Sequence, residues 1–408
     1  MSKKGIPEEM DGVDYLPEPS DPRMLSAVDP SIAGWQDQYR SQVVGWEPLP
    51  VPVTQAPRRV IHRTTGVWVV AIIVASLFVL WNTQSPITEL SYPDSEWAWK
   101  DSGLRELQAS NLSGNGIKVC IVDTGIDVKH PDLESTDIKF KDFVGQSTEP
   151  VDYGSSFHGT MMAGILVADG HIKGAAPNVS LSVAAALQSD NNGENTGDEN
   201  VVAAAIEWCW EQQNADIISL SLGGDAMAGS QSTYSAVELA LEKGVFVIAA
   251  AGNDGGEDDD GFVATPSNVP LAIAVGALDE EGKMWPSSSK GNQNLQQVTR
   301  KSPNQKPEIV APGVEIISTG PSSSYYLSSG TSDATVFVTG VVALMIEKYP
   351  ELGRANANGT SCIELVKHAI ANSSDTVAGQ QLPHDDRAGY GSLNSPNLLS
   401  EVGRTLPC

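Results

Sequence analysis

One stretch of the chain, in which a small polar loop runs directly into a long apolar segment, decides the fold: Leu327-Ser328-Ser329-Gly330-Thr331-Ser332-Asp333-Ala334-Thr335-Val336-Phe337-Val338-Thr339-Gly340-Val341-Val342-Ala343-Leu344-Met345. Val338, Val341 and Met345 recur at helical spacing, which predicts a buried helix. Ser332 falls at the N-terminus of that helix, where unpaired N–H groups and the helix dipole favour developing negative charge. Ser332 is therefore either an ordinary N-capping residue or a nucleophile.

The composition limits the classes of function. With 408 residues, the chain can form one large domain with appendages. It has 51 acidic and 25 basic residues and a formal net charge of −26, which argues against a nucleic-acid partner. Among its four cysteines, Cys120 and Cys209 lie in apolar patterns and are expected to be buried small hydrophobes. Cys362 and Cys408 either pair with each other or stay unpaired.

The N-terminal part predicts a tail and a membrane anchor. Residues 1–63 are expected to form a mostly disordered cytoplasmic tail, because they are rich in proline and acidic residues and lack an apolar period. A charge-free run of 25 residues, 64–88, follows, and we expect residues 64–86 to cross the lipid bilayer as one helix. A buried core helix and a cleaved signal peptide are the weaker alternatives. Basic residues precede the run and acidic residues follow it, which places the tail inside the cell and the rest outside.

The remainder is expected to form a linker, 87–96, and one domain, 97–408. Short β-branched runs at 116–122, 216–222 and 245–250 predict buried strands. Segments 104–112, 158–167, 203–212 and 235–243 predict helices. This alternation predicts an α/β fold, a doubly wound and mostly parallel sheet with helices on both faces.

Four polar residues lie at strand ends or helix starts, the edge at which such sheets carry chemistry: Asp123, His158, Asn253 and Ser332. Taken singly, Asp123 could be an ordinary turn residue and His158 an ordinary surface residue at the start of a helix. Together they supply an acid, an imidazole, an amide donor and a hydroxyl, the groups that acyl transfer by a serine nucleophile needs. Asp123-Thr124-Gly125 also suggests an aspartic peptidase, but that chemistry requires a second such carboxylate, and no second copy of the motif occurs.

The chain resembles the subtilisin-like serine peptidases over roughly residues 97–397. The order Asp, His, Ser is that of subtilisin. The resemblance lies in these blocks: Val122-Asp123-Thr124-Gly125-Ile126-Asp127, His158-Gly159-Thr160, Ser221-Leu222-Gly223-Gly224, Ala250-Ala251-Gly252-Asn253, Ala311-Pro312-Gly313, Ser329-Gly330-Thr331-Ser332 and Gly389-Tyr390-Gly391-Ser392-Leu393-Asn394. It implies a membrane-anchored serine endopeptidase that acts on proteins or peptides. A non-catalytic, membrane-anchored binding domain on the same fold is the alternative.

The resemblance also implies a role for each residue. Ser332 would attack the carbonyl, His158 would be the base, Asp123 would orient His158, and Asn253 with the Ser332 N–H would bind the oxyanion. The substrate-binding residues would be Ser221, Leu222, Gly223 and Gly224 on one wall and Ala250 and Gly252 on the other.

Two departures from the family pattern stand out. Asp333 follows the nucleophile where the family commonly has methionine, and we expect it to shift the pH optimum or to favour basic leaving groups. Calcium is the one cofactor that the resemblance suggests, and Asp132 stands where the family often has a ligating carboxylate. The stretch Ala168 to Gly174 is shorter than the usual calcium-binding loop, so no metal-ligating residue is assigned.

Overall fold

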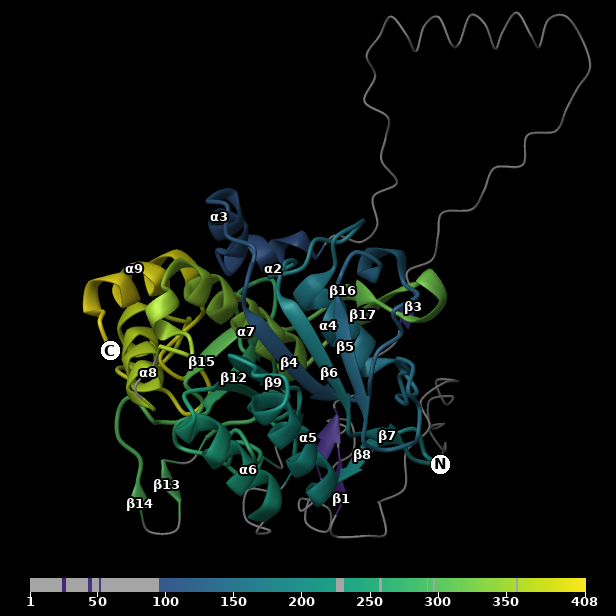
Figure 1. Ribbon diagram of the computed structural model, residues 1–408. Helices are drawn as coiled ribbons and strands as arrows, with labels where there is room; N and C mark the ends of the chain where they lie inside the picture. Colours follow the sequence, from purple (N-terminus) through teal and green to yellow (C-terminus); the bar gives the residue numbers. More distant parts are fainter. Residues whose placement is uncertain are drawn as a thin grey trace, which may run out of the picture.

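A seven-stranded sheet in which all neighbouring strands run parallel forms the centre of the molecule (Figure 1). In this computed structural model, the described residues are 24–26, 43–45, 51–52, 95–224, 231–256, 259–291, 293–295, 298–356 and 359–408. The order across the sheet is β15 (Ile309–Pro312), β12 (Ile273–Leu278), β11 (Phe246–Ala250), β9 (Ile217–Leu220), β4 (Lys118–Asp123), β6 (Ser180–Ala185) and β5 (Ile138–Asp142). The predicted parallel α/β fold is confirmed.

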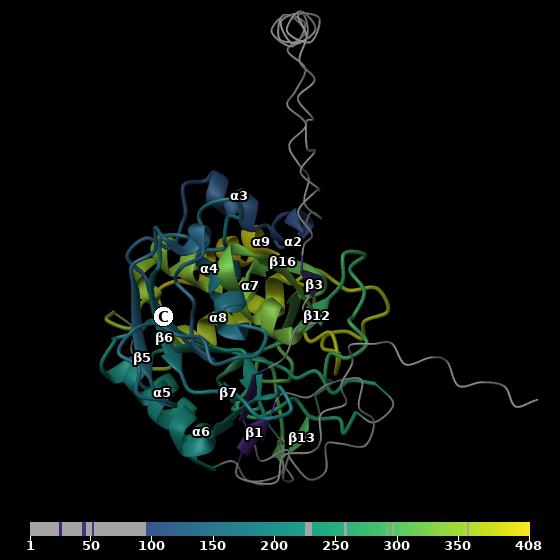
Figure 2. The same ribbon diagram turned by 90° about the vertical axis from the view of Figure 1, so that its right-hand side faces the viewer.

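Helices cover both faces of this sheet, as Figures 1 and 2 show. One face carries α4 (His158–Val167) and α7 (Thr331–Lys348), and the other carries α5 (Glu199–Glu211) and α6 (Gln231–Glu242). The remaining helices lie around these layers: α2 (Glu96–Asp101), α3 (Leu104–Ala109), α8 (Ser361–Ser373), α9 (Ser395–Thr405) and the short 3-10 turns η2 (Pro131–Leu133), η3 (Pro321–Ser323) and η4 (Pro350–Leu352). Helix α7 is buried from Thr331 to Ile346, as the apolar period predicted.

Several predicted boundaries differ in the structure. The helix expected over 235–243 is α6, which begins at Gln231, and the helix expected over 104–112 is α3, which ends at Ala109. The helix expected over 203–212 begins at Glu199, because the Asp198 side chain caps it by accepting the Asn200 N–H at 2.9 Å. The strand expected over 216–222 is divided into β9 and β10 (Leu222–Gly223). Leu222 leaves the central sheet and belongs to the edge strand of a second, smaller sheet.

The second sheet consists of short strands that follow β6 and β9 of the central sheet and of two pieces of the N-terminal tail. Its order is β10, β2 (Val43–Gly45), β1 (Met24–Ser26), β8 (Asn195–Asp198) and β7 (Gln188–Ser189). A third piece, β3 (Val51–Pro52), pairs with β17 (Tyr325–Ser328) of the hairpin that β17 forms with β16 (Ile316–Thr319). A two-stranded ribbon, β13 (Asn294–Leu295) and β14 (Val298–Thr299), completes the strands.

These pairings concern three short stretches of the tail that was expected to be mostly disordered and cytoplasmic. Three stretches of it find ladder partners on the domain, since exposed strand edges present unpaired backbone groups. Within one chain, such pairing requires the tail and the domain to share one side of any bilayer, whereas a single crossing at 64–86 separates them. Residues 64–86 lie outside the described part of the chain, and none of the helices in the described part has the length and apolarity that a bilayer crossing needs.

The cysteines differ from their prediction. Cys120 and Cys209 are buried, as expected, but they form a disulfide that joins β4 to α5. Their Cα atoms are 5.7 Å apart because α5 packs on β4, and this separation is within the range that a disulfide spans. Cys362 on α8 is bonded to Cys408, the pairing that the sequence left open. The described part of the chain contains no free cysteine.

Candidate active site

The nucleophile candidate lies in the first turn of α7, as predicted. Gly330 precedes the helix, and Ser332 is its second residue, so the Ser332 N–H belongs to the turn that has no partner inside the helix. Strands β16 and β17 and the loop after β15 bring this helix start to the carboxyl edge of the central sheet. The Ser332 side chain is 1% exposed.

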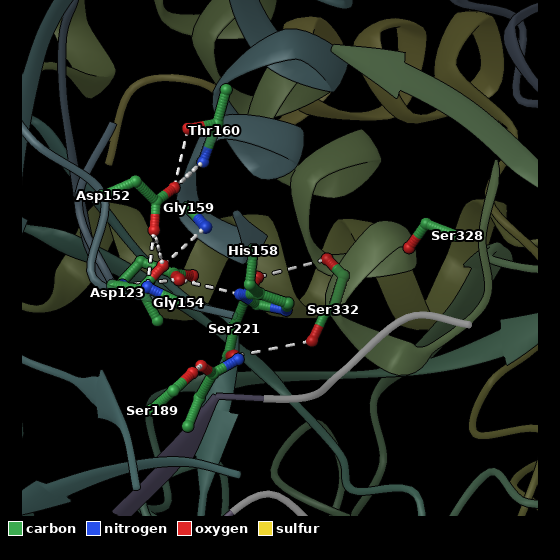
Figure 3. Close-up of polar contacts among 12 residues, drawn as sticks. Asp123, Asp152, Gly154, His158, Gly159, Thr160, Ser189, Ser221, Ser328 and Ser332 are labelled. Atoms are coloured by element: carbon green, nitrogen blue, oxygen red, sulfur yellow. Dashed lines mark hydrogen bonds and ion pairs between the residues drawn. The ribbon is translucent and has the colours of Figure 1, made fainter. Parts of the chain in front are cut away.

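Asp123 and His158 form a buried pair at the same edge (Figure 3). Asp123 ends β4 and His158 begins α4, and Nδ1 of His158 lies 2.7 Å from Oδ1 of Asp123, which also accepts the Thr124 N–H. Both side chains are fully buried. Burial alone would lower the pKa of His158, but the Asp123 charge and hydrogen bond, with smaller contributions from Asp333 and Asp152, raise it above the usual value. The imidazolium form of His158 is therefore stabilised.

The serine hydroxyl and the imidazole are not hydrogen-bonded in this structure. Ser332 Oγ donates to the Ser221 carbonyl at 3.4 Å, and Ser221 Oγ donates to the Ser332 carbonyl at 3.2 Å (Figure 3). Nε2 of His158 is buried and has no hydrogen-bond partner among the described residues. Catalytic hydrogen bonds are often absent without substrate, so this geometry leaves His158 available as a base.

Asn253 follows β11 and is held by the loop that carries the nucleophile. Its Oδ1 accepts the N–H of Thr331 at 3.0 Å and the Thr331 hydroxyl at 2.8 Å. Both bonds use the oxygen, so the two amide N–H groups remain as donors. The sequence thus placed four residues correctly at one edge of the sheet: Asp123, His158, Asn253 and Ser332.

Asp152 is a residue of this site that the sequence did not suggest. Its carboxylate accepts four hydrogen bonds, from the Thr124 hydroxyl, the Gly154 N–H and both the N–H and the hydroxyl of Thr160 (Figure 3). The Gly159 N–H in turn donates to the Thr124 hydroxyl. Asp152 therefore ties the end of β4, which carries Asp123, to the start of α4, which carries His158.

Gly159 makes the close approach of β4 and α4 possible. A Cβ at this position would lie 2.1 Å from the Gly125 carbonyl oxygen. A residue with a side chain at this position would therefore push β4 and α4 apart.

Of the six predicted substrate-binding residues, Ser221 and Gly252 contact the start of α7. Ser221 contacts Ser332 directly, Leu222 and Gly223 form β10, and Gly224 pairs with Thr265. On the other wall, Ala250 ends β11, and the Gly252 N–H donates to the hydroxyl of Thr331, the neighbour of Ser332.

Strands β1 and β2 of the tail lie between β10 and β8, the two strands that border this region. Strand β2 is the one beside β10. It pairs antiparallel with β10, with Gly45 opposite Leu222 and Val44 opposite Gly223. On the other side, β1 and β2 both pair antiparallel with β8. The base, the nucleophile and the amide donor are each no more than 3% exposed in this arrangement. In this structure, extended segments of the tail therefore occupy the region between β8 and β10.

Asp132 does not fit the calcium role that the resemblance suggests. Its carboxylate accepts the backbone N–H groups of His171 and Ile172 at 3.0 and 2.8 Å and the Tyr325 hydroxyl at 3.0 Å. Donors thus surround the oxygens that a cation would need. In the described part of the chain, no group of three or more His, Cys, Asp or Glu residues is placed to hold a metal ion.

A doubly wound parallel sheet with an Asp, a His and a Ser at its carboxyl edge, in this chain order, defines the subtilisin type of serine hydrolase. The chain belongs to the subtilase family: the model described as "Subtilase family" (Peptidase_S8) matches residues 114–391.

Several curated proteins are similar to it. The chain is 35% identical to subtilisin E of Bacillus subtilis (strain 168) over 247 residues, which is 60% of this chain and 59% of that protein. It is 34% identical to the serine protease AprX of the same organism over 321 residues, 71% of this chain and 67% of that one. The chain thus spans about three fifths of the length of subtilisin E. A solved structure, that of the prenylagaramide maturation protease PagA, matches with a TM-score of 0.58 and 26% identity over 74% of this chain and 98% of that chain.

Proposed function

We propose that this chain is a serine endopeptidase that hydrolyses peptide bonds in extended polypeptides. The observation that carries the proposal is the buried Asp123–His158 pair, with 2.7 Å between Nδ1 and Oδ1, at the sheet edge where Ser332 begins α7. Acid, base and nucleophile come from three separate elements of the fold and meet at one place. Membership of the subtilase family supports the same activity.

In the proposed reaction, Ser332 Oγ turns from the Ser221 carbonyl toward Nε2 of His158 and attacks the scissile carbonyl. His158 takes the hydroxyl proton and returns it to the leaving amine, while Asp123 stabilises the imidazolium. The oxygen of the tetrahedral intermediate would accept from an Asn253 amide N–H and from the unpaired Ser332 N–H. Water then releases the acyl group from Ser332 by the same proton transfers.

The substrate class follows from the two strand edges that border the site. β8 and β10 each present backbone N–H and C=O groups. In this structure β2 pairs antiparallel with β10, and β1 and β2 both pair antiparallel with β8. A substrate polypeptide in extended form would make the same ladder, with affinity from its main chain. This supports protein or peptide substrates over compact small esters.

Mass spectrometry of β-casein incubated with the purified full chain tests the proposal. We expect internal peptide bonds to be cleaved by the wild type, and the rate to fall by at least about 10³-fold in Ser332→Ala and in His158→Ala. Casein bound but uncleaved by a folded wild type would support the non-catalytic binding domain instead. Cleavage at equal rates by all three proteins would reveal a contaminating peptidase and refute the proposal.

We also propose that the domain works outside the cytoplasm and that residues 64–86 anchor it to the cell membrane. All four cysteines are disulfide-bonded, and such bonds persist in oxidising compartments. The charge-free run 64–88 supports the anchor. An anchored chain whose tail is cytoplasmic cannot also pair its own β2 with β10, so the two arrangements are separate states.

Protease digestion of intact cells that carry tags at both ends of the chain tests this topology. Loss of the C-terminal tag with an intact N-terminal tag is the expected result. Protection of the C-terminal tag would contradict the external location, and loss of both tags would contradict the single crossing.

A further inference from the structure

Asp333, the residue after the nucleophile, is a buried carboxyl group to which the triad assigns no role. Its side chain is 1% exposed, and Oδ2 accepts the Ser328 hydroxyl at 2.8 Å. Its Oδ1 is also buried and has no hydrogen-bond partner among the described residues. A buried carboxylate oxygen without a donor is costly, because water no longer solvates its charge.

The carboxyl group faces the same point as the amide of Asn253. A Cβ built on Gly330 would stand 3.4 Å from Nδ2 of Asn253 and 3.5 Å from Oδ2 of Asp333. The two side chains are therefore no farther apart than the sum of these distances. In the proposed reaction, the oxyanion forms against Nδ2 of Asn253, so negative charge develops close to Asp333.

The charged groups around Asp333 give it little compensation. His158 of α4 is the cation that acts on it, while Ser328 of β17 and Asn253 after β11 are neutral. The other carboxylates that act on His158, Asp123 at the end of β4 and Asp152, add negative charge to the same region. Burial outweighs these contacts and raises the pKa of Asp333 to about 7.

We propose that Asp333 is a neutral carboxylic acid in the working peptidase and that loss of its proton inhibits the reaction. The inference rests on the proposed peptidase function. With Oδ2 accepting from Ser328, Oδ1 is the oxygen that carries the proton. Once ionised, the buried carboxylate repels the oxyanion in the transition state.

Ionised Asp333 would also attract the imidazolium of His158. This attraction would stabilise the transition state, whereas the repulsion of the oxyanion would destabilise it. His158 already has Asp123 at 2.7 Å, and a second carboxylate adds little to that stabilisation. The oxyanion is bound only by neutral N–H donors, and the one cation named here, the imidazolium of His158, is already paired with Asp123. The repulsion therefore dominates, and the charge of Asp333 controls turnover.

The test is the pH dependence of kcat/KM, from pH 5 to 10, for the wild type and Asp333→Asn, with an internally quenched peptide as substrate. Asparagine keeps the size and the acceptor for Ser328 but cannot ionise. We expect the wild type to lose activity above about pH 7 and Asp333→Asn to stay active, so that their ratio reaches about 10- to 100-fold at pH 9. Near pH 6 the two should agree within about 2-fold.

Ser328→Ala provides a second, independent variant. The Ser328 hydroxyl stabilises the ionised form of Asp333, so its removal should move the alkaline fall to a higher pH. Circular dichroism and urea unfolding confirm that each variant is folded.

The possible results separate the two proposals. Active enzymes with the same pH profile, or an Asp333→Asn enzyme slower than the wild type at pH 9, would overturn the role of Asp333 and leave the peptidase function standing. No hydrolysis by either protein at any pH would overturn both.

Discussion

The stability of the fold should depend on pH through Asp333, independently of any activity. A carboxyl group with a pKa of about 7 in the folded chain, against 3.8 without the protein environment, favours its protonated form by about 4 kcal/mol. Because the pKa of Asp333 is raised in the folded chain, its contribution to the free energy of unfolding is complete below about pH 4 and is lost progressively as the pH rises to about 7. Above pH 7 the loss is constant.

The assay is urea unfolding of Ser332→Ala, which prevents self-digestion, with and without Asp333→Asn, at pH 4 to 8. Asparagine never ionises, so the double variant should match the parent near pH 4 and exceed its unfolding free energy by about 4 kcal/mol at pH 8. The difference should grow by about 1.4 kcal/mol per pH unit between pH 4 and 7.

Asp137→Asn is the matched control, since Asp137 is an exposed aspartate. Its effect should stay within about 0.5 kcal/mol at every pH. A difference between the Asp333→Asn variant and its parent that does not change from pH 4 to 8 would refute the reasoning, because it would show that Asp333 ionises as easily folded as unfolded.

Three further predictions concern the surroundings of the site. Asp152→Asn places an amide NH₂ against N–H and hydroxyl donors, so we expect the free energy of unfolding to fall by about 2–3 kcal/mol in urea unfolding. In peptide hydrolysis we expect kcat to fall about 10-fold with KM unchanged, and an unchanged kcat would contradict the positioning role of Asp152. Val44→Pro removes a ladder N–H from β2, and we expect Ser332 to react about 10-fold faster with a fluorophosphonate probe, whereas an equal rate would show that β2 does not cover the site in solution. Replacing both Cys120 and Cys209 by alanine should lower the unfolding free energy by about 2–4 kcal/mol, and a loss under about 0.5 kcal/mol would contradict a structural disulfide.

The central sheet and the four candidate catalytic residues could be predicted because each has a local signal. Apolar spacing identified α7, and β-branched runs identified β4 and β11. In a parallel sheet, the residues that follow such strands meet at one edge, so Asp123 and Asn253 could be placed together without any knowledge of contacts.

Other features left no pattern in the sequence. Asp152 acts through two threonines and two backbone N–H groups, and its bond to Thr124 spans 28 residues of chain. Strands β2, β8 and β10 contain two to four residues each, too few to show a period of two. An apolar setting suits both a free and a bonded cysteine, so the pairing of Cys120 with Cys209 required the packing of α5 on β4.

The most direct test of the central claim is to locate the residue that a fluorophosphonate probe modifies. The full-length wild type, Ser332→Ala and His158→Ala are treated with the probe, digested and mapped by mass spectrometry, with Val44→Pro included so that β2 cannot hide the site. We predict modification at Ser332 in the wild type and faster modification there in Val44→Pro, with no modification in the other two variants. Folded wild type and Val44→Pro that both stay unmodified, or modification at another residue, would contradict catalysis by an Asp123–His158–Ser332 triad.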